Sequence, residues 1–192
     1  MGKESTVAHV IVNNLGGITS LIQNLILFKP EESIHQELHV LDIEGNPNSP
    51  AFFDERLNPY IESFRLLPKD NWYKVYGKLA KRLNKHKGVL VSNDHFDLIM
   101  LTAFNIDRKV IQIVHDEYNL SLSVRFNDCI DYFIAHSKYI FHELCRLLPE
   151  RVNDIQLIHY GIPILKLQEK RQDGSGPLRL VFLGRHVRDK GV

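Results

Sequence analysis

The sequence of 192 residues predicts an α/β fold in which helices cover both faces of a doubly wound, mostly parallel sheet. Short runs rich in Val, Ile and Leu alternate along the chain with segments whose apolar residues recur at helical spacing. Most strand-like runs are apolar on successive residues, which indicates strands buried on both faces of the sheet. Hydrophobic residues make up 44% of the chain and charged residues 24%, which excludes a disordered or fibrous protein.

The charge and cysteine content exclude further classes of protein. The formal net charge of +1 gives no global attraction to nucleic acid, so no nucleic-acid partner is expected. Cys129 and Cys145 are too few for a disulfide scaffold or a cysteine-rich zinc module, and we expect free thiols in a reducing compartment. No apolar run approaches the roughly 20 residues that span a bilayer, and residues 1–6 lack the core of a signal peptide, so a cytoplasmic protein is expected.

The first half of the chain alternates predicted strands with predicted helices. Apolar runs that stop near Asn, Gly or Pro place strands at residues 7–12, 38–43, 61–67 and 88–91. Apolar residues at helical spacing place helices at residues 18–26, 70–87 and 96–104. Thr19 or Ser20 is expected to cap the first of these helices, and Asp70 the second.

The second half continues the alternation and then changes in composition. Strands are predicted at residues 109–114, 132–135 and 155–158. Ser137 is expected to cap a helix that ends at Pro149. The polar residues 166–177 are typical of a linker, and residues 178–183 predict one more strand. We therefore expect one domain over residues 1–165, a linker at 166–177, and the start of a truncated second domain at 178–192.

A glycine turn follows the first predicted strand, where sheets of this type bind ligands. Residues 13–17 read Asn-Asn-Leu-Gly-Gly. Gly16 and Gly17 would allow positive φ and a close approach of the backbone to a ligand, and the helix behind them offers N–H groups to an anion. A plain tight turn is the alternative. Neither the GxGxxG dinucleotide fingerprint nor a P-loop is present.

Two histidines follow strands at the same edge of the predicted sheet. His95 closes the sequence Ser-Asn-Asp-His after the fourth strand, and His115 follows the fifth. Imidazole exchanges hydrogen bonds with sugar hydroxyls and moves protons near neutral pH. Asp94 and Asp116 would either orient these rings or cap the helices that follow. The alternative for each histidine is an ordinary structural residue.

The sequence gives little support to a metal site or to the catalytic serine of a hydrolase. His136 and His159 also end strands, which makes a histidine cluster conceivable. No H-x-x-x-H or C-x-x-C spacing accompanies them, so no metal is expected. The G-x-S-x-G motif of α/β hydrolases is absent.

The helix predicted over residues 70–87 is locally basic. Its basic residues, with almost no acid among them, are Lys74, Lys78, Lys81, Arg82, Lys85 and Lys87. Such a face would be attracted to an anionic membrane surface or to an anionic acceptor. The alternative is a solvated face of an ordinary surface helix, since its apolar stripe would pack on the sheet.

The last residues form a strand, a glycine and a basic loop. Arg185 and Lys190, together with the N–H groups of a following helix, would suit a diphosphate. Since a lone strand has no sheet to join, this segment is expected to open a second domain.

Taken in order along nearly the whole chain, short segments resemble the retaining glycosyltransferases of family 4. They are residues 14–18 (Asn-Leu-Gly-Gly-Ile), His115-Asp116, residues 135–137 (Ala-His-Ser), residues 158–163 (Ile-His-Tyr-Gly-Ile-Pro), and Gly184-Arg185 through Lys190-Gly191. This family has the GT-B fold of two Rossmann-like domains. The resemblance implies that this chain is the N-terminal, acceptor-side domain followed by the first element of the C-terminal, nucleotide-sugar-binding domain.

The resemblance also implies a reaction and its residues. Gly16 and Gly17 would lie near the donor phosphate, and His115 would contact the donor sugar close to the reacting carbon. Arg185 and Lys190 would bind the nucleotide diphosphate and stabilise the leaving group, so no metal or other cofactor is required. A sugar would move, with retention of configuration, from a nucleotide sugar to a hydroxyl of a glycan or lipid-linked acceptor, as in polysaccharide biosynthesis.

Two departures from the family pattern matter. Thr19-Ser20 stand where many members carry an acid after the double glycine, and the family's paired glutamates belong to the second domain. The chain alone is therefore expected to be inactive. His95 and Asp94 are acceptor-side candidates on position alone.

Two rival functions remain beside the transferase. A non-catalytic α/β module would hold a ligand or regulate without turnover, and a second domain with paired acids after Val192 would argue against it. A nucleotide-sugar epimerase of GT-B shape would share the site but use different acids, and no segment favours it.

Overall fold

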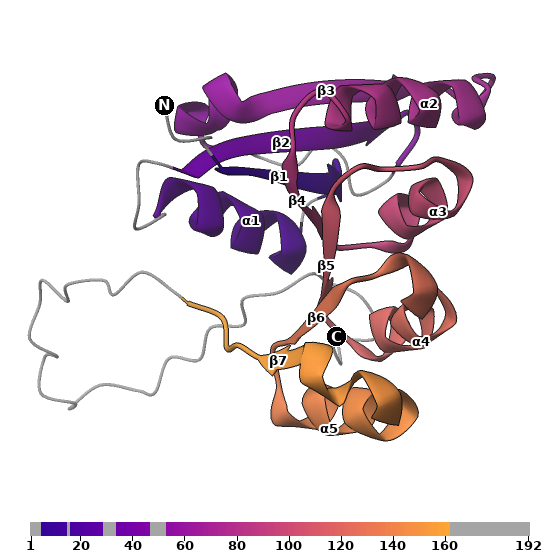
Figure 1. Cartoon of the computed structure of the whole chain (residues 1–192). Coiled ribbons are helices and arrows are strands. Elements are labelled where there is room, and N and C mark those ends of the chain that lie inside the picture. The colour runs from indigo at the N-terminus through magenta and orange to yellow at the C-terminus, as the bar shows by residue number, and fades with distance from the viewer. Residues whose placement is uncertain (1–4, 15, 29–33, 47–52, 162–192) are drawn as a thin grey trace, which may run out of the picture. The chain divides into compact units, whose positions relative to one another are not determined.

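The computed structural model describes residues 5–14, 16–28, 34–46 and 53–161 (Figure 1). The strands are β1 (Ser5–Val12), β2 (Ile34–Ile43), β3 (Ile61–Leu66), β4 (Gly88–Ser92), β5 (Lys109–Val114), β6 (Tyr132–Ala135) and β7 (Ile155–Leu157). The helices are α1 (Gly17–Leu27), α2 (Trp72–Leu83), α3 (His95–Ala103), α4 (Glu117–Arg125) and α5 (Lys138–Leu147). Short 3-10 turns are formed by Glu55–Tyr60, Asn127–Cys129 and Pro149–Asp154.

The strands form one parallel sheet in the order β3-β2-β1-β4-β5-β6-β7. The chain moves outward from β1 to β3, returns through α2 to β4 beside β1, and then moves outward in the other direction. The strand order therefore reverses between β1 and β4, which is the switch point where parallel α/β sheets bind ligands. The predicted doubly wound, Rossmann-like fold is confirmed.

Helices cover both faces of this sheet, as Figure 1 shows. Helices α2 to α5 lie on one face and pack against Leu90, Val110 and Phe133 of the strands. Helix α1 and the turn Glu55–Tyr60 lie on the other face, where Ile22 packs against the sheet. Burying apolar side chains on both faces at about 25 cal/mol per Å² holds the layers together.

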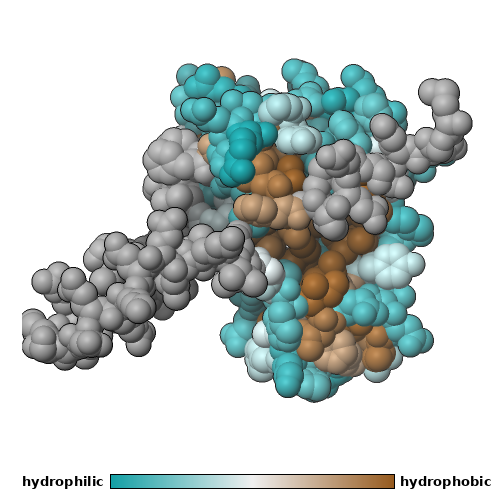
Figure 2. Space-filling view, turned by 90° about the vertical axis from the view of Figure 1, so that its left-hand side faces the viewer, coloured by the Kyte–Doolittle hydropathy of each residue, from teal (hydrophilic) through white to brown (hydrophobic). Residues whose placement is uncertain are grey.

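The α1 side of the sheet is only partly covered. Figure 2, which views this side, shows apolar side chains gathered across the middle of the face. Tyr132 on β6 is 46% exposed and Ile158, just after β7, is 50% exposed. Within the described residues, no helix covers β6 and β7 on this side (Figure 1).

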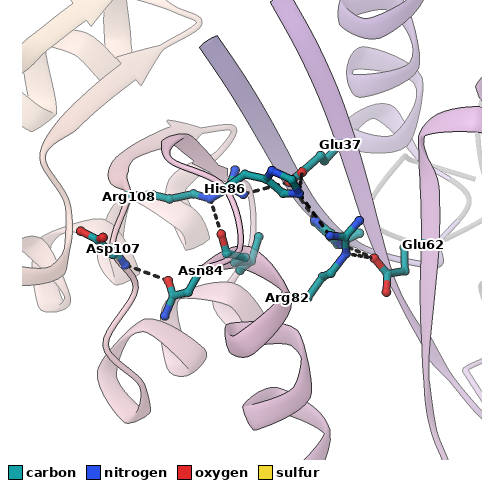
Figure 3. Close-up of polar contacts among 9 residues, drawn as sticks. Glu37, Glu62, Arg82, Asn84, His86, Asp107 and Arg108 are labelled. Atoms are coloured by element: carbon teal, nitrogen blue, oxygen red, sulfur yellow. Dashed lines mark hydrogen bonds and ion pairs between the residues drawn. The ribbon is translucent and has the colours of Figure 1, made fainter. Parts of the chain in front are cut away.

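A polar network ties the amino ends of the strands together (Figure 3). Glu37 of β2 is buried and accepts a hydrogen bond from Nη2 of Arg108 at 3.0 Å. Nε of Arg108 donates to the carbonyl oxygen of Leu83, at the end of α2, at 2.6 Å. Arg82 of α2 pairs with Glu62 of β3, with Nε and Oε2 2.5 Å apart. The network lies at the edge opposite the switch point.

Three sequence predictions about helix ends were tested. Helix α1 begins at Gly17, with Gly16 as its N-cap, so the expected cap by Thr19 or Ser20 was wrong. Asp70 accepts from the backbone N–H of Leu67 at 2.8 Å and closes the preceding turn, while Asn71 stands at the N-cap of α2. The Ser137 cap of α5 is confirmed, since its Oγ accepts from the N–H of Ile140 at 3.2 Å.

Two element lengths also differ from the prediction. Helix α2 ends at Leu83, where the basic pattern predicted a helix to residue 87. Strand β2 begins at Ile34 rather than residue 38, because Gln36 and Glu37 are polar but buried by tertiary contacts. The linker at 166–177 and the strand at 178–183 lie outside the described residues.

Candidate functional site

Side chains from three strand ends meet at the carboxyl edge of the sheet. Asn93 follows β4, His115 follows β5 and His136 follows β6. Tyr160, which follows β7 after two residues, joins them. Because all strands are parallel, their ends bring together residues that are up to 67 positions apart in the chain (160 minus 93).

Asn93 is fully buried at the switch point. Its Nδ2 donates to the carbonyl oxygen of Val10 in β1 at 3.3 Å and to that of Val91 in β4 at 3.2 Å. Its Oδ1 lies 3.3 Å from Nε2 of His115. One amide side chain thereby connects β1, β4 and the end of β5.

His115 is half-buried and held at both ring nitrogens. Its Nδ1 lies 2.6 Å from the hydroxyl of Tyr160, and its Nε2 contacts Asn93. Burial, with a further contribution from His136, lowers the pKa of His115 to about 4 against the opposing effect of Asp116. The ring is therefore neutral near pH 7 and acts there as one hydrogen-bond donor and one acceptor.

Tyr160 and His136 form the outer part of the cluster. Their ring centroids are 3.5 Å apart, and the ring of His115 lies 5.7 Å from that of His136. Nδ1 of His136 donates to the carbonyl oxygen of Ile158 at 2.6 Å. Burial raises the pKa of Tyr160 to about 12, so its hydroxyl keeps its proton at neutral pH.

Asp97 fixes the turn that carries Asn93. Its Oδ2 accepts from the backbone N–H of Asn93 at 2.6 Å, and its Oδ1 accepts from that of Asp94 at 3.0 Å. Asp97 is 1% exposed, and this burial raises the pKa of its carboxyl to about 7. Asp94 in turn caps α3, so the two acids form a capping box at the start of this helix.

The glycine turn lies at the end of β1, at the same edge of the sheet. Gly16 has a φ of 175°, which is extended backbone, so the predicted positive φ was wrong. A Cβ at Gly16 or Gly17 would meet no described atom within 4 Å. Neither backbone conformation nor packing within the described residues requires glycine here, which is consistent with room for a ligand. The first turn of α1 carries no acid, so an anion would meet no repulsion from it.

The other predicted histidine and acids have local roles. His95 begins α3, its Nδ1 contacts a carboxylate oxygen of Asp94, and its ring packs against Phe96 with ring centroids 4.0 Å apart. Asp116 caps α4 by accepting from the N–H of Asn119 at 2.8 Å. Helix capping was the stated alternative for both acids.

The remaining predictions concern the two basic residues near the C-terminus, metal binding and membrane spanning. Arg185 and Lys190 lie outside the described residues. Within residues 5–161 as described, no group of three or more His, Cys, Asp or Glu side chains is placed to hold a metal ion. The described helices also include none that is long and apolar enough to cross a membrane.

A surface hollow lies far from the cluster. It measures about 430 Å³ and is lined by residues that include Thr102, Asn105, Asp128 and Asp131. These residues lie near the amino ends of β5 and β6, at the opposite edge from His115. No predicted site residue lines it.

Asn93, Asp97 and Tyr160 were not predicted as site residues. Asn93 and Tyr160 each lie within a segment that the sequence analysis singles out, residues 92–95 and 158–163, but nothing local indicates that both contact His115. Their contacts with His115 join positions 22 and 45 residues apart. The position of Asn93 directly after β4 and of Tyr160 shortly after β7 was a signal in the sequence, whereas Asp97 lies inside α3.

No protein-family model and no curated protein matches this sequence. Solved structures do match its fold. Anabaena Alr3699/HepE in complex with UDP aligns with a TM-score of 0.60 and 14% identity over 82% of this chain and 44% of that chain. Its complex with UDP-glucose gives the same values.

A second protein has the same fold. The lipopolysaccharide outer core galactosyltransferase WaaB, in its apo form, aligns with a TM-score of 0.58 and 13% identity over 90% of this chain and 50% of that chain. The chain thus spans about half the length of these structures. Its described part has the Rossmann-like α/β fold that is also found in a UDP-glucose-binding protein and in a galactosyltransferase.

Proposed function

We propose that this chain is the acceptor-side half of a retaining glycosyltransferase with a GT-B fold and that it helps to bind a nucleotide sugar. The observation that carries the proposal is the neutral His115, held at both nitrogens at the carboxyl edge beside the switch point. Neutral imidazole suits a sugar hydroxyl, because it offers a donor or an acceptor without the desolvation cost of a charge. The fold shared with a UDP-glucose complex supports the same ligand class.

The glycine turn supplies the second part of the proposed site. No described atom lies within 4 Å of a Cβ built on Gly16 or Gly17, which supports close approach of a phosphate to the start of α1. The bond between the anomeric carbon and the diphosphate oxygen breaks, the acceptor hydroxyl oxygen bonds to the anomeric carbon, and the hydroxyl proton passes to the departing diphosphate. Negative charge develops on the diphosphate as its bond breaks. Arg185 and Lys190 are proposed to stabilise that charge, which is the role that a metal plays in other transferases.

A nucleotide-sugar screen tests this function. The full-length gene product is assayed for donor hydrolysis and transfer with UDP-, GDP- and ADP-linked sugars, beside His115→Ala and Arg185→Ala. Each variant is expected to lose about 100-fold or more in turnover, the usual effect of removing one charge-stabilising or orienting group. Asn153→Ala, an exposed site in the turn Pro149–Asp154, serves as the control.

The outcomes of the screen separate the two leading functions. Turnover that is lost in both variants while their unfolding temperatures stay unchanged supports the transferase. Nucleotide-sugar binding without turnover favours the non-catalytic ligand-binding module. Variants as active as the parent refute the assignment of His115 and Arg185.

We further propose that the acceptor is a glycan or a lipid-linked sugar and that the protein is cytoplasmic and docks on an anionic membrane through α2. Lys74, Lys78 and Lys81 are exposed on α2, whereas Arg82 is paired with Glu62 and contributes less. Sedimentation with vesicles containing anionic lipid is expected to fall for Lys78→Glu/Lys81→Glu and to stay unchanged for Lys138→Glu on α5. Equal sedimentation of all three proteins would leave the basic residues as an ordinary solvated face.

A further inference from the structure

The amide of Asn93 has only one orientation that satisfies its neighbours. The carbonyl oxygens of Val10 and Val91 lie 3.3 and 3.2 Å from one end of the amide. Carbonyl oxygens only accept hydrogen bonds, so that end must be the NH2 group. The other end, Oδ1, therefore faces His115.

The backbone of Asn93 is fixed as firmly as its side chain. Its N–H donates to Oδ2 of Asp97 at 2.6 Å, and the residue has no exposed surface. A rotated amide would turn its oxygen toward the carbonyl oxygens of Val10 and Val91, which only accept, so both hydrogen bonds would be lost. Leaving buried polar groups without these partners costs about 1–3 kcal/mol per group. The acceptor thus has a defined position before any ligand arrives.

An acceptor at that position determines where His115 carries its proton. Oδ1 of Asn93 lies 3.3 Å from Nε2 of His115 and can only accept, so Nε2 must donate. A neutral imidazole has one N–H group, which leaves Nδ1 as an acceptor. The hydroxyl of Tyr160, 2.6 Å from Nδ1, is the matching donor.

We propose that Asn93 is a positioning residue that fixes the Nε2–H tautomer of His115 and so presents Nδ1 as an acceptor for a hydroxyl group. In the described structure that hydroxyl belongs to Tyr160, whose side chain is 46% exposed and therefore replaceable. On the proposed function, which this step rests on, the replacing hydroxyl belongs to a sugar. The tautomer itself is a property of the protein alone.

Nitrogen NMR of the 192-residue chain labelled with 15N-histidine tests the tautomer directly. The signals of His115 are assigned by their absence in His115→Gln. Nε2 is expected to carry the proton and Nδ1 to be unprotonated at pH 7. A protonated Nδ1, or an equal mixture of tautomers, overturns the proposal. This measurement needs no variant of Asn93 and no ligand.

Variants then identify the residue that fixes the tautomer. Asn93→Ala removes the acceptor and is expected to produce a mixture of tautomers, while Asn93→Asp restores an acceptor and the Nε2–H form. Tyr160→Phe is expected to change only the Nδ1 signal. If Tyr160→Phe reverses the tautomer, Tyr160 rather than Asn93 is responsible. If the Asn93 variants do not fold, the wild-type and Tyr160→Phe spectra still decide the outcome.

Addition of UDP-glucose separates this inference from the proposed function. Addition of UDP-glucose is expected to shift the Nδ1 signal as a sugar hydroxyl replaces Tyr160, with Nε2 still protonated. An unchanged spectrum together with the expected tautomer would count against UDP-glucose as the ligand and leave the role of Asn93 supported. A ligand-induced change of tautomer would overturn that role.

Discussion

His115 lies at the edge of the sheet as a neutral ring, and its surroundings explain why. Burial and the neighbouring His136 both disfavour the charged imidazolium, and Asp116 compensates only in part. The usual pKa of 6.5 is thereby lowered to about 4. The ring keeps one donor and one acceptor over the whole physiological range, as recognition of a hydroxyl requires.

The titration of His115 follows from that lowered pKa. Its ring proton signals are expected to stay constant from pH 8 to about pH 5 and to titrate with a midpoint near 4. The comparison is the urea-unfolded chain, whose histidines should titrate near 6.5. A folded-state midpoint near 6.5 would contradict the burial of this ring.

His9 in β1 makes a second prediction, about stability. The ring is 3% exposed and its Nε2 pairs with Oε1 of Gln36 at 3.1 Å. Burial lowers its pKa from 6.5 to about 4, partly offset by Gln36 and assisted by His39. The unfolded chain binds this proton at a higher pH than the folded chain, so stability is greatest above about pH 6.5 and falls as the pH drops toward 4.

His9 alone is expected to lower the free energy of unfolding by about 2 kcal/mol when the pH falls from 7 to 5. Urea unfolding of wild type and His9→Gln at both pH values measures it. The variant, which keeps a polar side chain without a titrating ring, should lose less stability on acidification. An equal loss in both proteins would assign the pH dependence to other groups.

At the scale of single elements, the glycine at the start of β4 and the glycines at the start of α1 differ in structure. Gly88 at the start of β4 has a φ of +150°, and a Cβ there would overlap the backbone of Thr6. Gly16 is extended, and a Cβ on it or on Gly17 would meet nothing described within 4 Å. The first glycine serves the fold, whereas the other two leave space at the site.

Alanine substitutions separate these roles. Gly88→Ala is expected to destabilise the chain by about 2 kcal/mol or more, because strained φ and steric overlap add. The free energies of unfolding of Gly16→Ala and Gly17→Ala should lie within about 1 kcal/mol of the wild-type value. On the proposed function they should weaken UDP-glucose binding, measured by calorimetry. If Gly16→Ala binds UDP-glucose as tightly as wild type does, the glycine turn is not part of the site.

At the scale of the whole molecule, one buried ion pair connects strands that are not neighbours. Glu37 of β2 and Arg108 before β5 meet although β1 and β4 lie between their strands. Burial opposes ionisation of Glu37, but the hydrogen bond with His39 and the charge of Arg108 lower its pKa to about 2. The carboxylate is therefore charged and depends on its partners.

Replacing Arg108 alone should therefore lower the free energy of unfolding more than replacing both Arg108 and Glu37. Arg108→Met is expected to lose about 3–5 kcal/mol in urea unfolding, because it leaves Glu37 charged and buried. The double variant Glu37→Gln/Arg108→Met should recover much of that loss. Arg146→Met, which breaks an exposed pair with Glu143 on α5, should change stability little. A single variant as stable as the control would show that Glu37 does not need Arg108.

Most of the fold was predictable because its signals are local. Strands such as Lys109–Val114 and Tyr132–Ala135 stand out as apolar runs, and their predicted bounds match the structure. The cap at Ser137 was also local and is confirmed. The caps at Thr19 and Asp70 failed because several polar residues compete near a helix start and only backbone geometry selects among them.

The site was only partly predictable. The rule for parallel sheets placed His115 at the carboxyl edge of the sheet, and the structure confirms that position. Its partners Asn93 and Tyr160 follow other strands, and no periodic pattern connects them to it. Arg82 shows the same limit, since its partner Glu62 lies 20 residues away on β3.

The sequence by itself determined the parallel α/β fold, because apolar periodicity and turn residues act over a few positions and need no distant partner. It also determined that a histidine follows β5 at the carboxyl edge of the sheet. Only the tertiary structure decided the order of strands around the switch point, the buried amide that faces His115, and the lowered pKa of that ring. Those properties arise from burial and from hydrogen bonds between strand ends, which exist only once the sheet has formed.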